Sequence, residues 1–391
     1  MTAEPVRPRA LYAVPAGDLY RNFTAWQEGR RDSSQVALTY SHLFYRFCLD
    51  TGRDGIVSAP DAARRRVEDG RFAVAGRAPT RRDSTAHFLA GYLRNALAIT
   101  ALALRSGARE VILMDGVTFA FLLWPLSLAG RRIYRSDHTV LRPAFRPLSA
   151  TGRAILALEG WFLRHGCAGA LAVSDQIRAQ LRALAPNLPV LVFNPTYVRE
   201  DFADMAPASW AGGPFHVVFA GRIEASKGVF DLVAMMKTLL AEGRDVVLDI
   251  CGEGGQFAQL AAAVTAEGLD NAIRLHGHVS RDAMLGHLAR AQVVIVPTRT
   301  DFVEGLNKVV IEAVLARRPV ITSAVCPALD LVREAAVEAR PDDVTSYADA
   351  VRRLMDDAGL RTTLSSATET VRERFFDPAF GWAAKAAALL G

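Results

Sequence analysis

The chain has 391 residues, which exceeds one ordinary domain and indicates two domains of roughly 200 residues each. Apolar residues make up 51% of it and charged residues 22%, a balance that is typical of globular proteins and excludes an extensively disordered chain. Residues 1–205 hold 27 arginines, no lysine and 18 acidic residues, while the remainder carries −4 of the total net charge of +5, so a basic first half precedes an acidic second half.

The first 205 residues alternate predicted strands with predicted helices. The hydrophobic pattern predicts strands at residues 10–14, 54–58, 71–75, 110–114, 133–135, 168–173 and 190–193. Helices are expected at residues 35–50, 86–105 and 149–165, and from the cap residue Ser174 to Leu184. The apolar stretch 111–130 contains Asp115, Gly116 and Pro125, which favours a strand, a turn and a short helix over a membrane span.

Residues 203–214 have the proline, glycine and small-residue composition of a linker. After it the pattern predicts strands at 216–220, 246–251, 273–277, 292–296 and 319–322, and helices at 229–242, 256–267, 281–289 and 306–316. This alternation is typical of a doubly wound parallel sheet. The predicted architecture is therefore α/β, with one Rossmann-like domain over residues 1–205, a second over 206–374, and a C-terminal helix in 375–391 that packs back across the junction. Two such domains are expected to bind ligand in a cleft at the carboxyl ends of their strands.

The four cysteines, Cys48, Cys167, Cys251 and Cys326, are widely spaced and form no CxxC motif. We expect buried free thiols in a reducing compartment. The N-terminus has no long apolar signal-peptide core, and a cytoplasmic location is expected.

A phosphate site is predicted in the loop at residues 220–228, directly after a strand and before a helix. Gly221 and Gly228 let the backbone approach a ligand, the helix start offers free N–H groups, and Arg222 and Lys227 add two cations. The alternative is that both cations are solvated surface residues beside a turn.

A second predicted ligand loop runs from Asp301 to Glu312. Glu304 lies in the loop and Glu312 lies two turns into the helix, so the two carboxylates can face a cleft at points roughly 12 Å apart. Glu312 has apolar neighbours and needs a partner, which ribose hydroxyls would supply. The amides of Gly305, Leu306 and Asn307 can meet a second phosphate. The alternative is a first-turn acid that is favoured by the helix dipole, with an exposed glutamate further along.

Together with the Gly-rich turn at 252–255 and the HGHVS segment at 276–280, these loops resemble glycosyltransferase family 4 over most of residues 190–330. The resemblance implies a GT-B fold, which is two facing Rossmann-like domains, and a retaining transfer of a sugar from a nucleoside diphosphate sugar to a hydroxyl. It further implies roles for individual residues of this chain: Arg222 and Lys227 neutralise the donor diphosphate, Glu304 contacts the sugar, Glu312 contacts the ribose, and the backbone near Val279 contacts the base.

The resemblance is fainter in the first half. His138, in Ser136-Asp137-His138-Thr139 after a strand, looks like the family's cleft histidine beside the reacting sugar; the alternative is a structural histidine. Asp18 and Tyr20 stand where the family's glycine-rich first loop would be, and are the acceptor-binding candidates.

No metal or other cofactor is expected, because two cations already serve the leaving diphosphate and the chain offers no convincing Asp-x-Asp motif. Two alternatives stay open, a GT-B epimerase or phosphorylase and a non-catalytic sugar-nucleotide-binding protein. The expected partners are the nucleotide sugar and a hydroxyl acceptor, in cell-surface polysaccharide or glycolipid assembly, and the acceptor can be lipid-linked.

The basic first half indicates an anionic partner. Anionic lipid on the inner membrane face is favoured over nucleic acid, because the arginines are not interleaved with stacking aromatics. The candidate membrane contacts are Arg64, Arg65, Arg66, Arg81, Arg82, Arg131, Arg132, Arg135, Arg142 and Arg146. The alternative is an ordinary solvated face.

Overall fold

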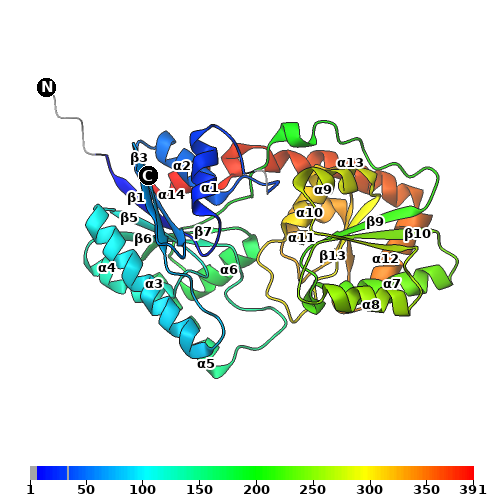
Figure 1. The fold of residues 1–391 in the computed structure, drawn as a ribbon, viewed down its shortest axis with the longest axis horizontal. Coiled ribbons are helices and arrows are strands. Elements are labelled where there is room, and N and C mark those ends of the chain that lie inside the picture. The colour runs from blue at the N-terminus through cyan, green and yellow to red at the C-terminus, as the bar shows by residue number, and fades with distance from the viewer. Residues whose placement is uncertain (1–6, 33–34) are drawn as a thin grey trace. The chain divides into compact units, whose positions relative to one another are not determined.

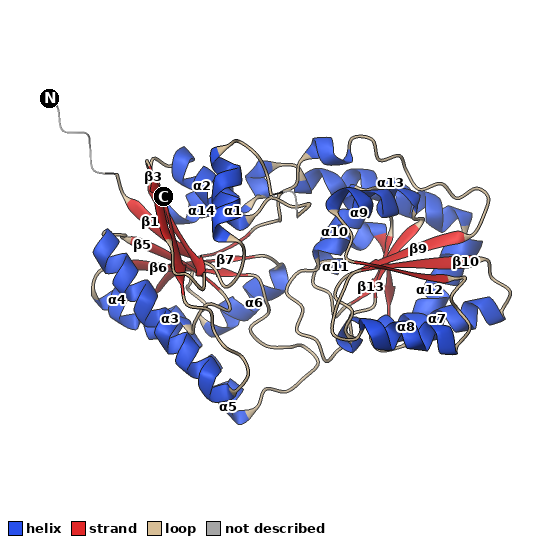
Figure 2. Cartoon of the chain, viewed as in Figure 1, coloured by secondary structure: helices blue, strands red, loops and turns tan. Residues whose placement is uncertain are grey.

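A computed structural model describes residues 7–32 and 35–391 of the chain. The chain forms two compact units (Figure 1). Unit 1 is built from the described residues up to Arg142, from Leu148–Thr196 and from Asp377–Gly391, and unit 2 from Pro143–Pro147 and Tyr197–Phe376. Each unit has its own sheet with helices on both faces (Figure 2), which confirms the predicted α/β class.

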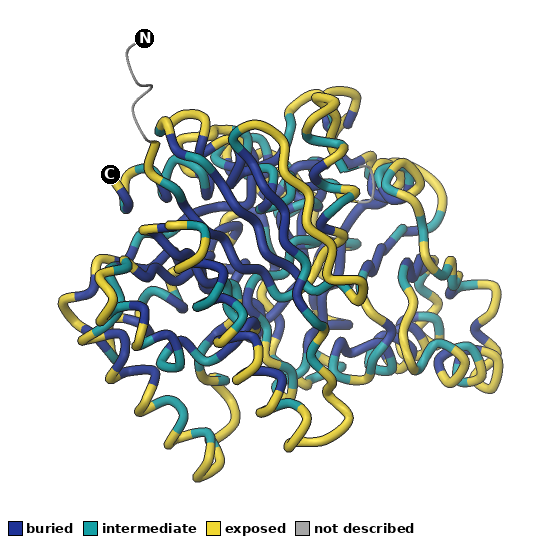
Figure 3. Tube along the Cα trace, turned by 60° about the vertical axis from the view of Figure 1, so that its left-hand side comes forward, coloured by how far each residue is buried: buried dark blue, intermediate teal, exposed yellow. Residues whose placement is uncertain are grey.

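The sheet of unit 1 has the strand order β3-β4-β2-β1-β5-β6-β7-β8, and all its pairs are parallel except β3 with β4. Its strands are β1 (Arg9–Ala13), β2 (Asp54–Pro60), β3 (Arg66–Asp69), β4 (Phe72–Arg77), β5 (Glu110–Met114), β6 (Arg132–Asp137), β7 (Cys167–Ala172) and β8 (Val190–Val192). The central strands are buried along their length (Figure 3), as their continuous apolar sequences require.

Alternate side chains of these strands face two helical layers. Leu11, Val111 and Ile133 share one core with α3 (Thr85–Ser106), η1 (Ala120–Leu123), α4 (Trp124–Leu128) and α5 (Ala150–His165). On the other face, Tyr12 lies 5.3 Å from Phe44 and 5.1 Å from Trp382 between ring centroids. That face is covered by α1 (Leu19–Gln27), α2 (Tyr40–Asp50) and α14 (Trp382–Leu390), and α6 (Asp175–Leu184) precedes β8.

Helix α3 is the one helix, among the residues that the structure describes, with the length and hydropathy of a membrane span. Ala96, Ile99 and Ala103 on this helix are buried in the core of unit 1, as in the core helix of a folded domain. The stretch 111–130 forms β5, η1 and α4, as predicted.

The sheet of unit 2 has the order β11-β10-β9-β12-β13-β14 with parallel pairs throughout. Its strands are β9 (Phe215–Ala220), β10 (Val246–Cys251), β11 (Ile273–Gly277), β12 (Val293–Val296), β13 (Val320–Ser323) and β14 (Ala336–Ala339). Its helices are α7 (Val229–Ala241), α8 (Phe257–Ala266), α9 (Arg281–Arg290), α10 (Lys308–Leu315), α11 (Leu329–Val332), α12 (Val344–Asp356) and α13 (Ala358–Arg372). Helices α7, α8 and α12 pack with the sheet around one hydrophobic core of unit 2.

The boundary between the units falls between Thr196 and Tyr197, earlier than the predicted boundary after residue 205. The intervening segment packs on unit 2, because Arg372 donates to the carbonyl of Phe202 at 3.4 Å and Arg281 pairs with Asp201 at 2.5 Å. The four cysteines are free, three of them buried and Cys167 half-buried.

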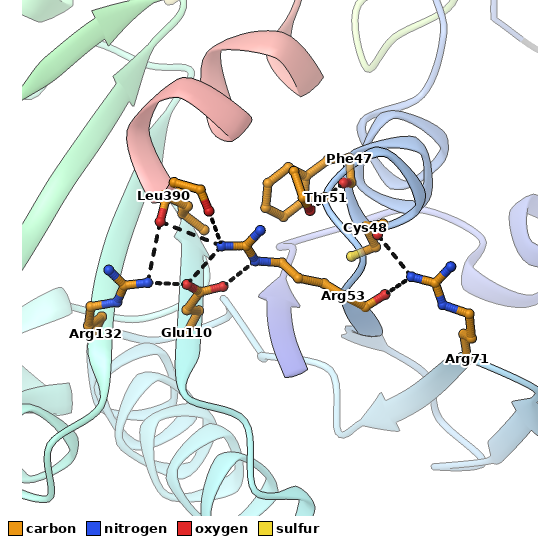
Figure 4. A network of polar contacts seen from close by, with 9 residues as sticks. Phe47, Cys48, Thr51, Arg53, Arg71, Glu110, Arg132 and Leu390 are labelled. Atoms are coloured by element: carbon orange, nitrogen blue, oxygen red, sulfur yellow. Dashed lines mark hydrogen bonds and ion pairs between the residues drawn. The ribbon is translucent and has the colours of Figure 1, made fainter. Parts of the chain in front are cut away.

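Helix α14 returns to unit 1 and ends at a buried arginine (Figure 4). Arg53 donates from Nε to Glu110 Oε2 at 2.7 Å and from Nη2 to the carbonyl of Gly391 at 2.7 Å. Arg132 contacts Glu110 and the carbonyl of Leu390. The terminal segment predicted to pack across the junction is therefore an integral part of unit 1.

Several elements differ from the prediction. Helix α2 begins at Tyr40 because the Thr39 side chain accepts from the amide of His42. Helix α10 begins at Lys308 because Asn307 caps it. Helix α1 and strand β3 were not predicted, and neither were the elements between Leu329 and Arg372.

Candidate active site

The loop at residues 220–228, where a phosphate site was predicted, is held by two glycines of the next loop. A Cβ at Gly252, which has φ +144°, would lie 1.8 Å from the carbonyl oxygen of Gly221, and one at Gly254 would lie 2.4 Å from that of Ile223. The amides of Gly221 and Ile223 donate to the carbonyls of Cys251 and Glu253 at 3.0 and 2.9 Å. The Gly-rich turn therefore fixes the backbone after β9.

Gly228 ends η3 (Ala225–Lys227) and precedes α7. Its φ is +75°, and a Cβ there would lie 2.2 Å from the carbonyl oxygen of Pro297, after β12. Only glycine combines this backbone conformation with so close a neighbour. The loops after β9 and β12 are thereby brought together, and between these two strands the order of the sheet reverses, which is where doubly wound sheets bind ligands.

Lys227 and Glu304 meet at this point. Lys227 Nζ lies 2.7 Å from Glu304 Oε2, and their side chains are 10% and 9% exposed. The hydroxyl of Thr298 donates to the same oxygen at 3.2 Å, and the side-chain Nδ2 of Asn307 does so at 3.4 Å. Two residues that are 77 positions apart, and that the sequence singled out separately, form one buried ion pair.

The ring of Phe302 lies near both predicted cations, Lys227 and Arg222. Lys227 Nζ lies 3.7 Å from the centroid of its ring, and the Arg222 guanidinium lies 5.5 Å from it on a side chain that is 60% exposed. Arg222 also pairs with Glu224 at 2.7 Å. Arg222 can therefore reorient toward a ligand, whereas Lys227 is held in place.

Glu312 lies further along α10 and has two polar neighbours. The hydroxyl of Tyr197 donates to Glu312 Oε1 at 3.4 Å. Burial raises the pKa of Glu312 and lowers the pKa of Lys308, and each side chain opposes the shift of the other. A carboxylate in this setting is a ready acceptor for ligand hydroxyls.

Three predicted donor contacts are backbone positions. Gly305 and Leu306 lie in the loop between Glu304 and the cap of α10, where the Asn307 side chain accepts from the amide of Val309 at 3.0 Å. Val279 follows β11, where the amide of Gly252 donates to the carbonyl of Gly277 at 2.7 Å. The loop that holds Val279 therefore adjoins the Gly-rich turn.

One group of side chains, among residues 7–32 and 35–391, has the spacing of a metal site: Asp249, His276 and His287. His276 Nε2 and Asp249 Oδ1 are 2.6 Å apart, which is already a hydrogen bond. The Arg290 guanidinium lies 3.4 Å from His287 Nδ1. Because Arg290 places a positive charge beside the group, we interpret it as a polar support for the loop after β11.

In unit 1, His138 is oriented through Ser136. The indole N–H of Trp382 donates to Ser136 Oγ at 2.9 Å, and Ser136 Oγ lies 2.9 Å from His138 Nε2. An indole N–H can only donate, so Ser136 accepts from Trp382 and its own proton remains available to donate to His138 Nε2. This arrangement favours the neutral imidazole with its proton on Nδ1.

Four ionisable groups lie beside His138: Arg135, Asp137 and Glu159 are buried, and Asp115 is half-buried. Arg135 pairs with Glu159 at 2.5 Å and contacts Asp137, while Asp115 accepts from the amide of His138 at 2.9 Å. Burial raises the pKa of all three carboxyls against the attraction of Arg135, and that of Asp137 reaches about 6. This network was not predicted, because its only local signal is an arginine and an aspartate inside a strand.

A cavity of about 570 Å³ lies at the reversal point of this sheet, between the loops after β1 and β5. It is lined by Pro15, Ala16, Arg82, Phe88, Tyr92, Met114, Asp115, Gly116, Arg135, His138, Thr139, Val140 and Leu141. The predicted acceptor residues have other contacts: Asp18 caps α1 by accepting from the amide of Arg21, and Tyr20 donates to the carbonyl of Arg65 at 2.5 Å. Their role toward an acceptor stays a prediction.

The chain is similar in sequence and fold to known glycosyltransferases. Residues 200–371, which lie in unit 2, match the family model described as glycosyl transferases group 1. A 2-deoxystreptamine glucosyltransferase from Streptomyces kanamyceticus is 28% identical over 67% of this chain and 72% of its own length. A glycogen synthase from Mycobacterium tuberculosis is 28% identical, and the alignment spans 53% of this chain and half of the synthase.

Solved structures resemble the chain over nearly its whole length. A sucrose-phosphate synthase from Thermosynechococcus elongatus has a TM-score of 0.70 at 18% identity and covers 98% of this chain and 97% of its own. HepE from Anabaena in complex with UDP has a TM-score of 0.65 at 14% identity, with 98% of each chain covered. At these identities the likeness concerns the fold, which is GT-B.

Proposed function

We propose that the protein is a retaining glycosyltransferase of family 4 that moves a sugar from a nucleoside diphosphate sugar to a hydroxyl acceptor. The observation that carries this proposal is the contact of Lys227 with Glu304 where the order of the unit 2 sheet reverses. A buried cation and a carboxylate at such a point offer one group for a diphosphate and one for sugar hydroxyls. The UDP in the HepE structure supports testing a uridine nucleotide first.

The chemistry of the leaving group explains the charges. As the glycosidic bond breaks, the diphosphate gains negative charge and the sugar acquires oxocarbenium character. Lys227 and Arg222 stabilise the departing diphosphate, Glu304 holds the sugar and Glu312 binds the ribose, without a metal. Preorganised charge of this kind is often the largest single contribution to catalysis.

The donor can be tested directly by a thermal-shift screen of UDP, GDP and ADP sugars. A ligand that binds the native state raises the melting temperature, so we expect one nucleotide class to raise it. Glu312→Gln should reduce that shift, whereas Glu334→Gln, an exposed change in the same unit, should not. Absence of a shift with every nucleotide sugar would contradict the proposal.

Metal independence is tested separately with a chelator. If the two cations replace a metal, turnover measured in excess EDTA should equal turnover in its absence. Loss of turnover that added Mg²⁺ or Mn²⁺ restores would contradict this account of the leaving group.

We further propose that unit 1 contacts the inner, anionic face of a membrane during polysaccharide or glycolipid assembly in the cytoplasm. Several candidate arginines have acidic partners, among them Arg65 with Asp61 and Arg81 with Asp83, and Arg135 is buried. The exposed leucines of α3, Leu89, Leu93, Leu97 and Leu104, offer an apolar contribution in addition to the charge of the arginines. Flotation with vesicles should therefore require anionic lipid and weaken with Leu97→Asp; flotation independent of lipid charge would contradict the contact.

A further inference from the structure

The cavity beside His138 adjoins a second cavity of about 270 Å³ within unit 1. The two share Tyr92, Asp115 and Leu141 as lining residues. Their combined size is that of a small-molecule site. A single ligand can therefore occupy both.

The two cavities differ in chemistry. The first presents His138, Asp115 and Arg82, which are polar groups that can bind hydroxyls or an anionic group. The second is lined largely by apolar side chains, among them Leu113, Phe119, Leu148, Ile155 and Leu156.

The charges at the second cavity are already satisfied by the protein. Glu159 Oε2 accepts from Arg135 at 2.5 Å, and Glu159 Oε1 accepts from the amide of Ala120 at 2.7 Å. These two charges are therefore paired with each other, and Arg135 Nε is the one atom of the pair that is buried without a hydrogen-bond partner among the described residues. What the second cavity offers a ligand is apolar surface.

We propose that the acceptor is an amphiphile, whose hydroxyl-bearing polar part lies beside His138 and Asp115 and whose apolar part fills the second cavity. This inference rests on the proposed glycosyl transfer, since it names the class of acceptor for that reaction. An aliphatic chain or an aromatic ring attached to a sugar or polyol has the required form.

Binding of alkyl β-glucosides tests the proposal without any turnover. Calorimetric titration of the whole chain with butyl to octyl glucoside, below the micelle concentration, should show affinity rising roughly fourfold per methylene until the cavity is full. Glucose itself should bind more weakly than butyl glucoside. An affinity that does not depend on chain length overturns the proposal.

Two variants on α5 form a matched pair. Leu156 lines the second cavity, whereas Leu158 is 47% exposed on the same helix and does not line it. Leu156→Asp should abolish the dependence on chain length and Leu158→Asp should preserve it. If both retain it, the alkyl chain binds elsewhere, for example on the leucines of α3, and the proposal fails.

A further variant and a separate measurement keep the outcomes apart. Should Leu156→Asp not fold, as judged by circular dichroism, Leu148→Asp at the same cavity replaces it. Chain-length-dependent binding in a protein that neither binds nor turns over any nucleotide sugar would contradict the proposed function while supporting an amphiphile site. Nucleotide-sugar turnover without chain-length-dependent binding would overturn the amphiphile alone.

Discussion

Lys227 is held by contacts within the protein and is also the proposed ligand of the donor diphosphate. In the absence of a donor it is held by Glu304 at 2.7 Å and by the ring of Phe302 at 3.7 Å. A donor diphosphate would accept from the ammonium group of Lys227, and Glu304 would then accept from sugar hydroxyls. The ion pair therefore holds both side chains of the proposed donor site in position, so they need to move little when a donor binds.

Lys227→Ala should lower turnover about a hundredfold, because removing one donor to a developing charge typically raises the barrier by ~3 kcal/mol. Steady-state kinetics with saturating donor measures this. Lys237→Ala is the matched control, since Lys237 is 60% exposed and pairs with Glu267 in the same unit. An unchanged rate in Lys227→Ala would remove the lysine from the reaction.

The ring proton of His138 can be predicted from Trp382. In the wild type we expect the tautomer with the proton on Nδ1, detected by long-range proton–nitrogen NMR of histidine-labelled protein. Trp382→Phe keeps the aromatic packing but removes the N–H that Ser136 accepts, so the Nε2–H tautomer should become populated. Identical histidine spectra would show that Trp382 does not act through Ser136.

Asp137 should make the stability of unit 1 depend on pH. Burial raises the pKa of Asp137 in the folded state from 3.8 to about 6. Between these two pH values the folded state holds a proton that the unfolded state has released. Stability from this group is full below pH ~4 and is lost as pH rises through 6, with a slope of at most about 1.4 kcal/mol per pH unit.

Urea unfolding across pH 4–7 tests this effect. Asp137→Asn should lose less stability than the wild type over that interval, because its side chain does not titrate. Parallel curves for the two proteins would mean that Asp137 stays ionised throughout. Asp175→Asn, at an exposed aspartate of the same unit, serves as the control.

At the scale of elements, close contacts between backbones determine where the ligand loops lie. Gly252→Ala should destabilise unit 2 by more than Gly243→Ala, although both glycines have positive φ. At Gly243 no atom lies within 4 Å of an added Cβ, whereas at Gly252 the carbonyl oxygen of Gly221 would be 1.8 Å away.

The control substitution should cost about 1 kcal/mol from the backbone conformation alone. The Gly252 variant should cost clearly more and also weaken the thermal shift given by the nucleotide sugar, because the 221–228 loop must move. Equal melting temperatures for the two variants would mean that the turn adapts without strain.

The strands and most helices could be predicted because their apolar patterns are continuous or periodic. Strand β3 could not, since Arg66–Asp69 is exposed at every position and carries no alternation. Helix α1 could have been found, because Asp18 provides an N-cap and Leu19 and Phe23 are spaced by one turn. Lys227, Glu304 and Arg222 were recognisable from local motifs. Thr298, Phe302, Ser136 and Trp382 were not, because their roles depend on contacts between distant segments.

At the scale of the whole molecule, the chain enters unit 1 more than once. Unit 1 contains Asp377–Gly391, and its core includes Trp382, which is fully buried against Tyr12. A fragment of residues 1–205 would therefore keep α1 and α2 but leave the part of the Tyr12 face that α14 covers exposed.

We expect the 1–205 fragment to lack a cooperative thermal transition by circular dichroism. Joining residues 1–196 to 377–391 through a short glycine–serine linker should restore it, since the amide of Asn194 donates to the carbonyl of Phe380 at 2.8 Å and the two ends lie close together. A cooperative transition in the 1–205 fragment, at the temperature of the fusion, would show that α14 contributes little.

Trp382 is synthesised after residues 197–376, and this order has a consequence for folding during synthesis on the ribosome. Residues 197–376 leave the exit tunnel before residues 377–391, so unit 2 can close its core while the larger sheet still lacks one of its covering helices. The unit that is translated first is thus completed last, because α14 can cover the Tyr12 side of its sheet only after the whole of unit 2 has been synthesised.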